Sequence, residues 1–208
     1  MTDRPRITPT ENGPYILENC EKITRLADGK VFEIEGTANL CRCGGSKNKP
    51  FCDGTHATIG FSAEKLDGRV PDKRDDYHGS GITIHDNRGI CSHAGYCTDR
   101  LKSVFKLEEE PWIDPDGAKT REIIDTIRQC PSGALSYSLD NVEHRDQDRP
   151  PMVTVTRNGP YFVTGGIELI GQEMGDGASS EHYALCRCGA SKNKPFCDGS
   201  HWHIGFED

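Results

Sequence analysis

The feature that most constrains this chain is a sixteen-residue sequence that occurs twice. CRCGGSKNKPFCDGTH at residues 41–56, the first motif, returns as CRCGASKNKPFCDGSH at residues 186–201, the second motif. The match extends outward, because NGPYIL at residues 12–17 corresponds to NGPYFV at residues 158–163. A solenoid needs at least about three stacked repeats to bury a continuous core, so two copies indicate a pair of duplicated modules.

Each motif contains three cysteines and one histidine in the pattern C-x-C-x8-C-x3-H. A C-x-C pair in an extended chain points both thiolates to the same side, because alternate residues share a face. The glycine-rich loop can then wrap a bound group, and an Asp-Gly turn brings the histidine back. The eight candidate metal ligands are Cys41, Cys43, Cys52, His56, Cys186, Cys188, Cys197 and His201.

Three chemistries are open to these ligands. Thiolate and imidazole suit zinc and iron-sulfur clusters about equally by ligand type. Structural zinc sites usually combine two similar C-x2-4-C pairs, whereas the ligands here do not form two similar pairs. Disulfides are the third alternative, and the reducing cytosol in which we expect the chain disfavours them.

The two motifs resemble the CDGSH iron-sulfur domain (mitoNEET-like) family. The second motif ends in CDGSH at residues 197–201, and the first departs from that sequence only at Thr55. The resemblance implies a [2Fe-2S] cluster held by three cysteines and one histidine in each copy, with the histidine at an exposed edge. Because the units of that family usually sit together as a homodimer, the resemblance also implies that the tandem copies form an internal pseudo-dimer.

The segment between the copies has a cysteine pattern of its own. CSHAGYC at residues 91–97 and CPSGAL at residues 130–135 supply the candidate ligands Cys91, Cys97 and Cys130. Ferredoxins with C-x2-C-x2-C and a remote C-P hold a [4Fe-4S] cluster, and this chain has Ala94 in place of the second cysteine.

This stretch resembles a divergent branch of the single-cluster bacterial ferredoxins. The resemblance implies a [3Fe-4S] cluster, or a [4Fe-4S] cluster with an outside fourth ligand, for which His93 is a candidate. The alternative is a ferredoxin-like domain that has lost its cluster and keeps its cysteines for packing.

Short apolar runs between turn residues predict the strands, and longer periodic segments predict the helices. We expect strands at residues 15–18, 30–36, 81–86, 133–139, 152–156, 161–170 and 182–186, and helices at 98–105 and 118–129. Two polar seams, residues 69–81 and 140–151, bracket the segment between the motifs. The predicted fold class is α+β, with mostly β modules at residues 1–71 and 149–208 and an inserted ferredoxin-like domain at residues 72–148, the middle segment.

Charge and composition exclude several classes of function. A formal net charge of −8 argues against nucleic acid as a partner. No apolar stretch reaches the ~18 residues of a membrane span, and the first residues do not form a signal peptide. We therefore expect a cytoplasmic protein without membrane attachment. No phosphate-binding loop, Ser-His-Asp set or HExxH sequence is present, so we expect no enzymatic activity.

The remaining cysteine and histidines have no ligand partner at a useful spacing. Cys20 has no cysteine counterpart in the second copy, so we expect a small buried side chain. Five histidines in polar seams or at strand ends are expected at the surface: His78, His85, His144, His182 and His203.

These patterns predict an electron-transfer protein with two [2Fe-2S] clusters and a third, [3Fe-4S] or [4Fe-4S], cluster. One alternative is a carrier of [2Fe-2S] clusters or a redox or pH sensor, and the other is a zinc-stapled interaction module. The expected partners are redox proteins or apo acceptors of clusters. We expect a monomer that contains an internal pseudo-dimer.

Overall fold

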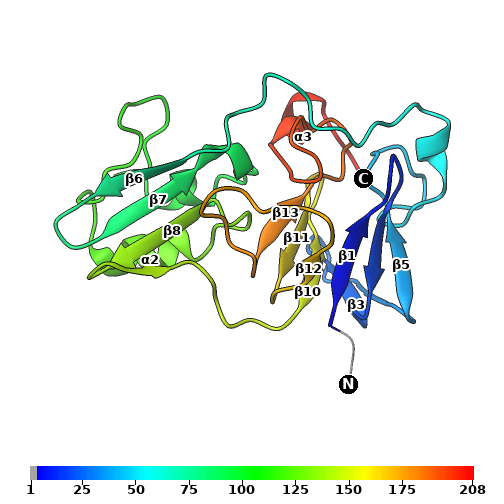
Figure 1. Cartoon of the computed structure of the whole chain (residues 1–208), viewed down its shortest axis with the longest axis horizontal. Coiled ribbons are helices and arrows are strands. Elements are labelled where there is room, and N and C mark those ends of the chain that lie inside the picture. The colour runs from blue at the N-terminus through cyan, green and yellow to red at the C-terminus, as the bar shows by residue number, and fades with distance from the viewer. Residues whose placement is uncertain (1–3) are drawn as a thin grey trace.

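The computed structural model describes residues 4–208 of the chain and contains three β-sheets in that range. Two of the sheets combine strands from both outer segments, and the third belongs to the middle segment (Figure 1). The middle segment lies to one side of the two combined sheets. No described helix is long and apolar enough to cross a membrane.

The first combined sheet has the order β12-β1-β2-β5. Its strands are β1 (Arg6–Pro9), β2 (Tyr15–Glu18), β5 (Thr37–Leu40) and β12 (Glu168–Leu169). β1, β2 and β5 pair antiparallel, and β12 joins them from the far end of the chain by parallel pairing with β1.

The second combined sheet has the order β13-β11-β10-β3-β4. Its strands are β3 (Lys22–Arg25), β4 (Val31–Glu33), β10 (Met152–Val155), β11 (Tyr161–Thr164) and β13 (Tyr183–Leu185). The hairpin β3-β4 adds to the sheet of the later segment through the parallel pair β3 and β10. Each outer segment therefore supplies strands to a sheet built mainly by the other.

One hydrophobic core lies between these sheets and draws on both segments. Tyr15 and Leu17 alternate with half-buried residues along β2, while Tyr161 and Val163 occupy the equivalent places on β11. All four side chains are fully buried. Burying a Val or Leu side chain contributes about 1.5–3 kcal/mol, so the repeated alternation holds the two segments together.

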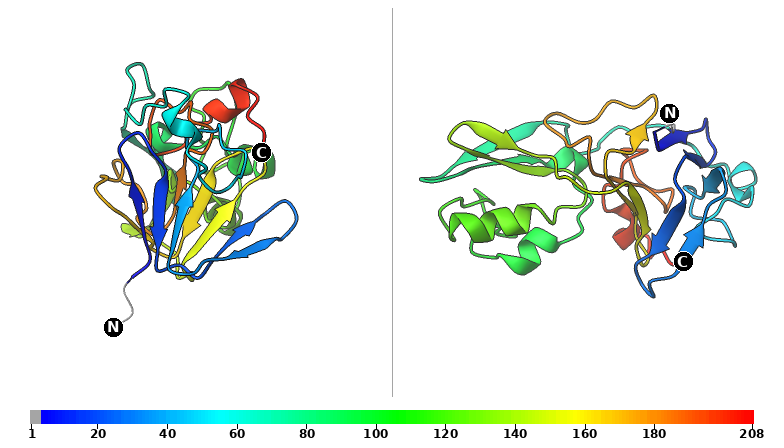
Figure 2. Two further views of the ribbon diagram at one scale, coloured as in Figure 1. Left: turned by 90° about the vertical axis from the view of Figure 1, so that its right-hand side faces the viewer. Right: turned by 90° about the horizontal axis from the view of Figure 1, so that it is seen from below.

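The middle sheet is antiparallel and has the order β6-β7-β8-β9. Its strands are β6 (Arg74–His78), β7 (Thr83–Asn87), β8 (Leu135–Leu139) and β9 (Val142–His144). Two helices, α1 (Tyr96–Arg100) and α2 (Thr120–Ile127), cover one face of this sheet (Figure 2). Ile84, Ile123 and Leu135 pack between sheet and helices in a second core.

Three short helical turns complete the described chain: η1 (Thr55–Ala57), η2 (Arg88–Ile90) and α3 (Ser200–His203). η1 and α3 occupy the same place in the two motifs, directly after the Asp-Gly turn. η2 precedes the first cysteine of the middle segment.

Several predicted elements differ from those observed. The expected strand at residues 161–170 divides into β11 and β12, because Gly165 and Gly166 both have positive φ. A Cβ at Gly165 would lie 2.3 Å from the backbone of Pro150 and Pro151, so no other residue fits. The helix expected at residues 98–105 ends after Arg100, and the one expected at 118–129 extends only from Thr120 to Ile127.

The polar seams were wrongly predicted as connections. The first contains β6 and the second contains β9, and these are the two edge strands of the middle sheet. Edge strands carry charged residues that discourage pairing with other chains, which makes them resemble polar linkers in sequence. Arg74 of β6 contacts Glu143 of β9 at 3.1 Å, so some of those charges are paired.

Candidate iron-sulfur sites

The first motif folds back on the end of β5. The amide of Cys41 donates to the carbonyl of Pro50 at 2.8 Å, and that of Cys52 donates to the carbonyl of Asn39 at 2.8 Å. The second motif repeats this closure, with Cys186 and Cys197 in the corresponding places. The backbone therefore brings the third cysteine of each motif beside the first.

The four side chains of each motif form two close pairs. In the first motif the Sγ atoms of Cys41 and Cys43 lie 3.8 Å apart, and Cys52 Sγ lies 3.4 Å from His56 Nδ1. In the second motif the corresponding distances are 3.8 Å and 3.5 Å. The eight predicted ligands thus lie in four close pairs, two in each motif.

These distances can be tested against metal coordination. Two thiolates bound at about 2.3 Å to one tetrahedral metal lie about 3.8 Å apart, and a thiolate and an imidazole nitrogen lie about 3.5 Å apart. Both values match the observed pairs. In residues 4–208, no three His, Cys, Asp or Glu side chains are grouped to hold a single ion. The donor set of each motif therefore fits two metal centres with two protein ligands each.

The Asp-Gly turn is held from inside each motif. Asp53 accepts hydrogen bonds from the amides of Lys47, at 2.8 Å, and Thr55, at 3.0 Å. Hydrogen bonds from Thr55 and Lys47 hold the pKa of Asp53 well below its usual range. Gly54 and Gly199, which follow the aspartates, have φ of 88° and 83°. The predicted turn is present in both copies.

Two tyrosines connect each motif to the opposite segment. Tyr15 donates from its hydroxyl to the carbonyls of Cys186 and Pro195, both at 2.9 Å. Tyr161 donates reciprocally to the carbonyls of Cys41, at 2.8 Å, and Pro50, at 2.9 Å. Our sequence reasoning missed both tyrosines as site residues, although the repeated NGPY sequence contains them.

The two motifs also touch each other directly. Cys43 and Cys188 form an antiparallel β-bridge. A Cβ at Gly44 would lie 2.5 Å from the carbonyl oxygen of Cys188, and a Cβ at Gly189 would lie 2.5 Å from that of Cys43. Glycine is required at both positions because the backbones cross so closely.

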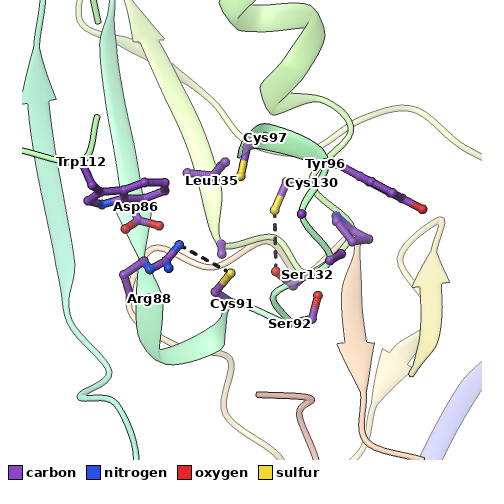
Figure 3. Close-up of a pocket in the computed structure, with 14 residues that line it drawn as sticks. Asp86, Arg88, Cys91, Ser92, Tyr96, Cys97, Trp112, Cys130, Ser132 and Leu135 are labelled. Carbon is purple, nitrogen blue, oxygen red and sulfur yellow. Dashed lines mark hydrogen bonds between the residues drawn. The ribbon is translucent and has the colours of Figure 1, made fainter. Parts of the chain in front are cut away.

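The three cysteines of the middle segment line one pocket (Figure 3). Cys91 follows η2, Cys97 lies on α1, and Cys130 follows α2. Burial raises the pKa of Cys91 to about 12 and that of Cys97 to about 11. Arg88 also lines the pocket, and its Nη1 lies 3.8 Å from Cys91 Sγ. The free thiols of Cys91 and Cys97 are therefore neutral at pH 7, and a bound metal would displace their protons.

The same pocket contains buried oxygen atoms without partners. Among residues 4–208, buried side-chain nitrogen and oxygen atoms without a hydrogen bond occur at Asp86, Ser92 and Arg145. Asp86, 2% exposed, and Ser92, 1% exposed, both line the pocket. Burial raises the pKa of Asp86 to about 7. An unpartnered buried polar group is costly, so these atoms fit a pocket that holds a bound group.

Asp86 was missed by the sequence reasoning. It ends the apolar run GITIHD, where an acidic residue looks like the start of a turn. His93, the predicted candidate for a fourth ligand, does not line the pocket. Its ring lies against Gly199 of the second motif.

The remaining predictions for single residues were confirmed in part. Cys20 is 7% exposed, which confirms the expected buried side chain. Three histidines are exposed as predicted: His78, His144 and His203. His85 and His182 are buried, so for them the prediction was wrong. Each has hydrogen-bond partners that make burial possible: Asp76 and Ser138 for His85, and Ser179 and Glu181 for His182.

Comparison with known proteins finds a family match for the two outer segments and another for the middle segment. Residues 12–57 and 158–202 match the family described as iron-binding zinc finger CDGSH type, and residues 77–140 match the family described as divergent 4Fe-4S mono-cluster. Uncharacterized protein YjdI of Escherichia coli strain K12 is 39% identical over 61 residues, which cover 29% of this chain and 80% of YjdI. YjdI of E. coli O157:H7 matches equally.

The chain belongs to the CDGSH family. It carries two CDGSH segments and, between them, a divergent 4Fe-4S mono-cluster domain. The matched residues include all eight candidate ligands of the two motifs and the three cysteines of the middle pocket. The chain is therefore an iron-sulfur protein.

Proposed function

We propose that this CDGSH protein transfers single electrons and holds a [2Fe-2S] cluster in each motif through three cysteines and one histidine. The observation that carries the proposal is the division of each ligand set into two close pairs. In a [2Fe-2S] cluster each iron has two protein ligands, which agrees with that division. A structural zinc ion would need four ligands grouped around one point.

The bound clusters would supply one-electron chemistry at a potential raised by the imidazole ligand, since histidine in place of a thiolate removes negative charge. The protein's own part is to hold the ligands. Gly45 and Gly54 place their amides 3.4 Å from the sulfurs of Cys43 and Cys52, where they favour an anionic sulfur. We assign no catalytic reaction to the chain, and we place it in the cytoplasm, where cysteines stay reduced.

The two outer segments form an internal pseudo-dimer in this proposal. The exchanged strands support it, since β12 pairs with β1 and β3 pairs with β10. The reciprocal bonds of Tyr15 and Tyr161 support it independently. We therefore expect the functional unit to be a monomer.

A third cluster, [3Fe-4S] or [4Fe-4S], binds in the middle pocket through Cys91, Cys97 and Cys130. This part rests on the convergence of three thiols on one pocket and on the unpartnered oxygens beside them. The family match of residues 77–140 supports a cluster of the 4Fe-4S type.

The test is a count of iron, zinc and acid-labile sulfide on protein reconstituted without oxygen, together with electron paramagnetic resonance of the oxidised and the reduced protein. We expect about four irons in [2Fe-2S] signals and about three or four more in a separate signal. Cys130→Ser should remove the separate signal and leave the [2Fe-2S] signals intact. A colourless protein that contains zinc would refute the assignment.

A cluster carrier is the second candidate function. It is favoured by the partial exposure of Cys43, Cys52 and His56 in the first motif. Incubation of the holo protein with an apo ferredoxin separates the two candidates. Transfer of iron and sulfide to the acceptor supports the carrier, whereas electron exchange with retention of iron supports the electron-transfer protein.

A further inference from the structure

The two motifs differ in how far the rest of the chain covers them. In the second motif Cys188 is 9% exposed, Cys197 2% and His201 5%. The corresponding Cys43, Cys52 and His56 are all partly exposed. The sequences of the motifs are nearly identical, so the difference comes from what packs against them.

The middle segment covers the second motif through its first cysteine loop. Asn193 donates from Nδ2 to the carbonyl of Gly89 at 2.9 Å. His93 lies so close to Gly199 that a Cβ there would meet three of its side-chain atoms at 2.9–3.1 Å. The counterpart of Gly199 is Gly54, and a Cβ there would have no atom within 4 Å.

Trp202 completes this contact beside the histidine ligand. Its ring lies 4.9 Å from that of His201, and its Nε1 donates to the carbonyl of His93 at 3.3 Å. In the first motif the residue after the histidine is Ala57. The second motif thus has a large side chain that shields the histidine and binds the middle segment. The first motif has alanine at that position.

The connection between the first motif and the middle segment also crosses the second motif, as the cyan-to-green chain in Figure 1 shows. Leu66 donates its amide to the carbonyl of Lys192 at 2.8 Å. Lys65 places Nζ 5.8 Å from the ring centre of Phe196. Residues 65–66 therefore hold the loop that carries Cys197.

We propose that the two CDGSH sites have separate roles: the first is the site that partner proteins and small chelators reach, and the second keeps its cluster behind a cover formed by His93, Trp202 and residues 65–66. The inference rests on the proposed function, because it assumes a cluster in each motif.

The test is the rate at which an iron chelator removes [2Fe-2S] clusters from the holo protein, followed by visible absorbance and by iron released. In the Cys130→Ser background, which lacks the proposed third cluster, we expect two phases of about equal amplitude. Cys197→Ser, which leaves a cluster in the first motif, should show only the fast phase, and Cys52→Ser should show only the slow phase. Equal rates in these two variants would overturn the inference.

Variants of the cover sharpen the test without altering a ligand. Trp202→Ala removes a hydrogen bond and a ring contact, so the slow phase should accelerate by up to about tenfold while the fast phase is unchanged. Gly199→Ala and Gly54→Ala form a matched pair, because both glycines have similar positive φ and only Gly199 meets a neighbour. Gly199→Ala should accelerate the slow phase more than Gly54→Ala accelerates the fast one.

The starting iron content separates the two possible failures. A protein that holds fewer than about four irons in [2Fe-2S] signals before chelation contradicts the proposed function. If the Cys130→Ser protein starts with all four irons but loses them in one phase, and Trp202→Ala has no effect, the inference of separate roles is contradicted. The proposed function is then unaffected.

Discussion

Asp86 illustrates how a single residue can be unfavourable for folding and still fit a site. Its carboxyl is buried without a well-formed hydrogen bond, and burial raises its pKa to about 7 although Arg88 and Trp112 act to lower it. The folded state of the metal-free protein therefore binds the proton more tightly than the unfolded chain, in which the pKa is about 3.9. Stability from this group is fully present below about pH 4 and is lost as the pH rises through about 7.

Asp86→Asn should remove that loss. At pH 8 we expect the metal-free variant to be more stable than wild type by about 1–3 kcal/mol, and at pH 4 we expect nearly equal stability. Urea unfolding of both proteins at the two pH values measures this. Asp67→Asn, at an exposed position, is the control. A difference from wild type that does not grow with pH would show that Asp86 is partnered in solution.

Residues differ in how visible their roles are in sequence. The eight candidate ligands of the motifs could be singled out from sequence because ligands for one site recur at fixed short spacings. Asp86 was not, since nothing local shows that an acid at the end of a strand turns inward. The burial of His85 and His182 was hidden for a related reason, because their partners come from other strands or turns.

At the scale of elements, Glu181 fixes the turn before β13. It accepts two hydrogen bonds from Arg149, at 2.6 and 3.0 Å, and one from the amide of Gly165 at 2.8 Å. Burial raises the pKa of Glu181, but the bonds from Arg149 and Gly165 outweigh it, so the pKa falls to about 2. The stability from this group is present above about pH 4.3 and is lost as the pH falls through about 2.

Glu181→Gln should therefore cost about 1–3 kcal/mol at pH 7, because a charged acceptor of several hydrogen bonds is lost. The difference from wild type should shrink as the pH falls below about 4. Urea unfolding at pH 7 and pH 3 measures it, with Glu173→Gln, at an exposed position, as the control. A deficit of equal size at both pH values would mean that packing, rather than charge, is responsible.

Three strands with a buried face, β2, β10 and β11, were predicted, whereas β1, β3 and β5 also have a buried face and were missed. β2, β10 and β11 alternate apolar residues with others, and that alternation is visible in the sequence. β6 and β9 lie at sheet edges and contain mostly polar residues, so their sequences do not distinguish them from linkers. Which strand pairs with which could not be predicted from local sequence, since β1 and β12 are separated by most of the chain.

At the scale of the whole molecule, the crossed tyrosines predict crossed effects. Tyr15→Phe removes the hydroxyl that bonds two carbonyls of the second motif, and Tyr161→Phe does the same in the first; the proline carbonyl of each pair keeps its bond from a cysteine amide. Each change should cost about 1–2 kcal/mol in urea unfolding. Chelator-driven loss should accelerate in the second motif for Tyr15→Phe and in the first motif for Tyr161→Phe.

Tyr183→Phe is the matched control for this prediction. Its hydroxyl donates to the carbonyl of Ile167 within its own segment, at 2.7 Å. It should lower stability by a similar amount without favouring the loss of either cluster. If Tyr15→Phe instead accelerates loss from the first motif, the hydroxyl does not act across the two segments.

The exchanged strands also set the order in which the chain can mature during synthesis. The first motif leaves the ribosome early, but β12, which extends its sheet, and Tyr161, which holds its loop, lie more than a hundred residues later. Contacts between such distant residues form late, because the entropy cost of closing a long loop comes before the contacts can stabilise the fold. The first motif to be synthesised therefore waits for residues more than a hundred positions later before its scaffold is complete.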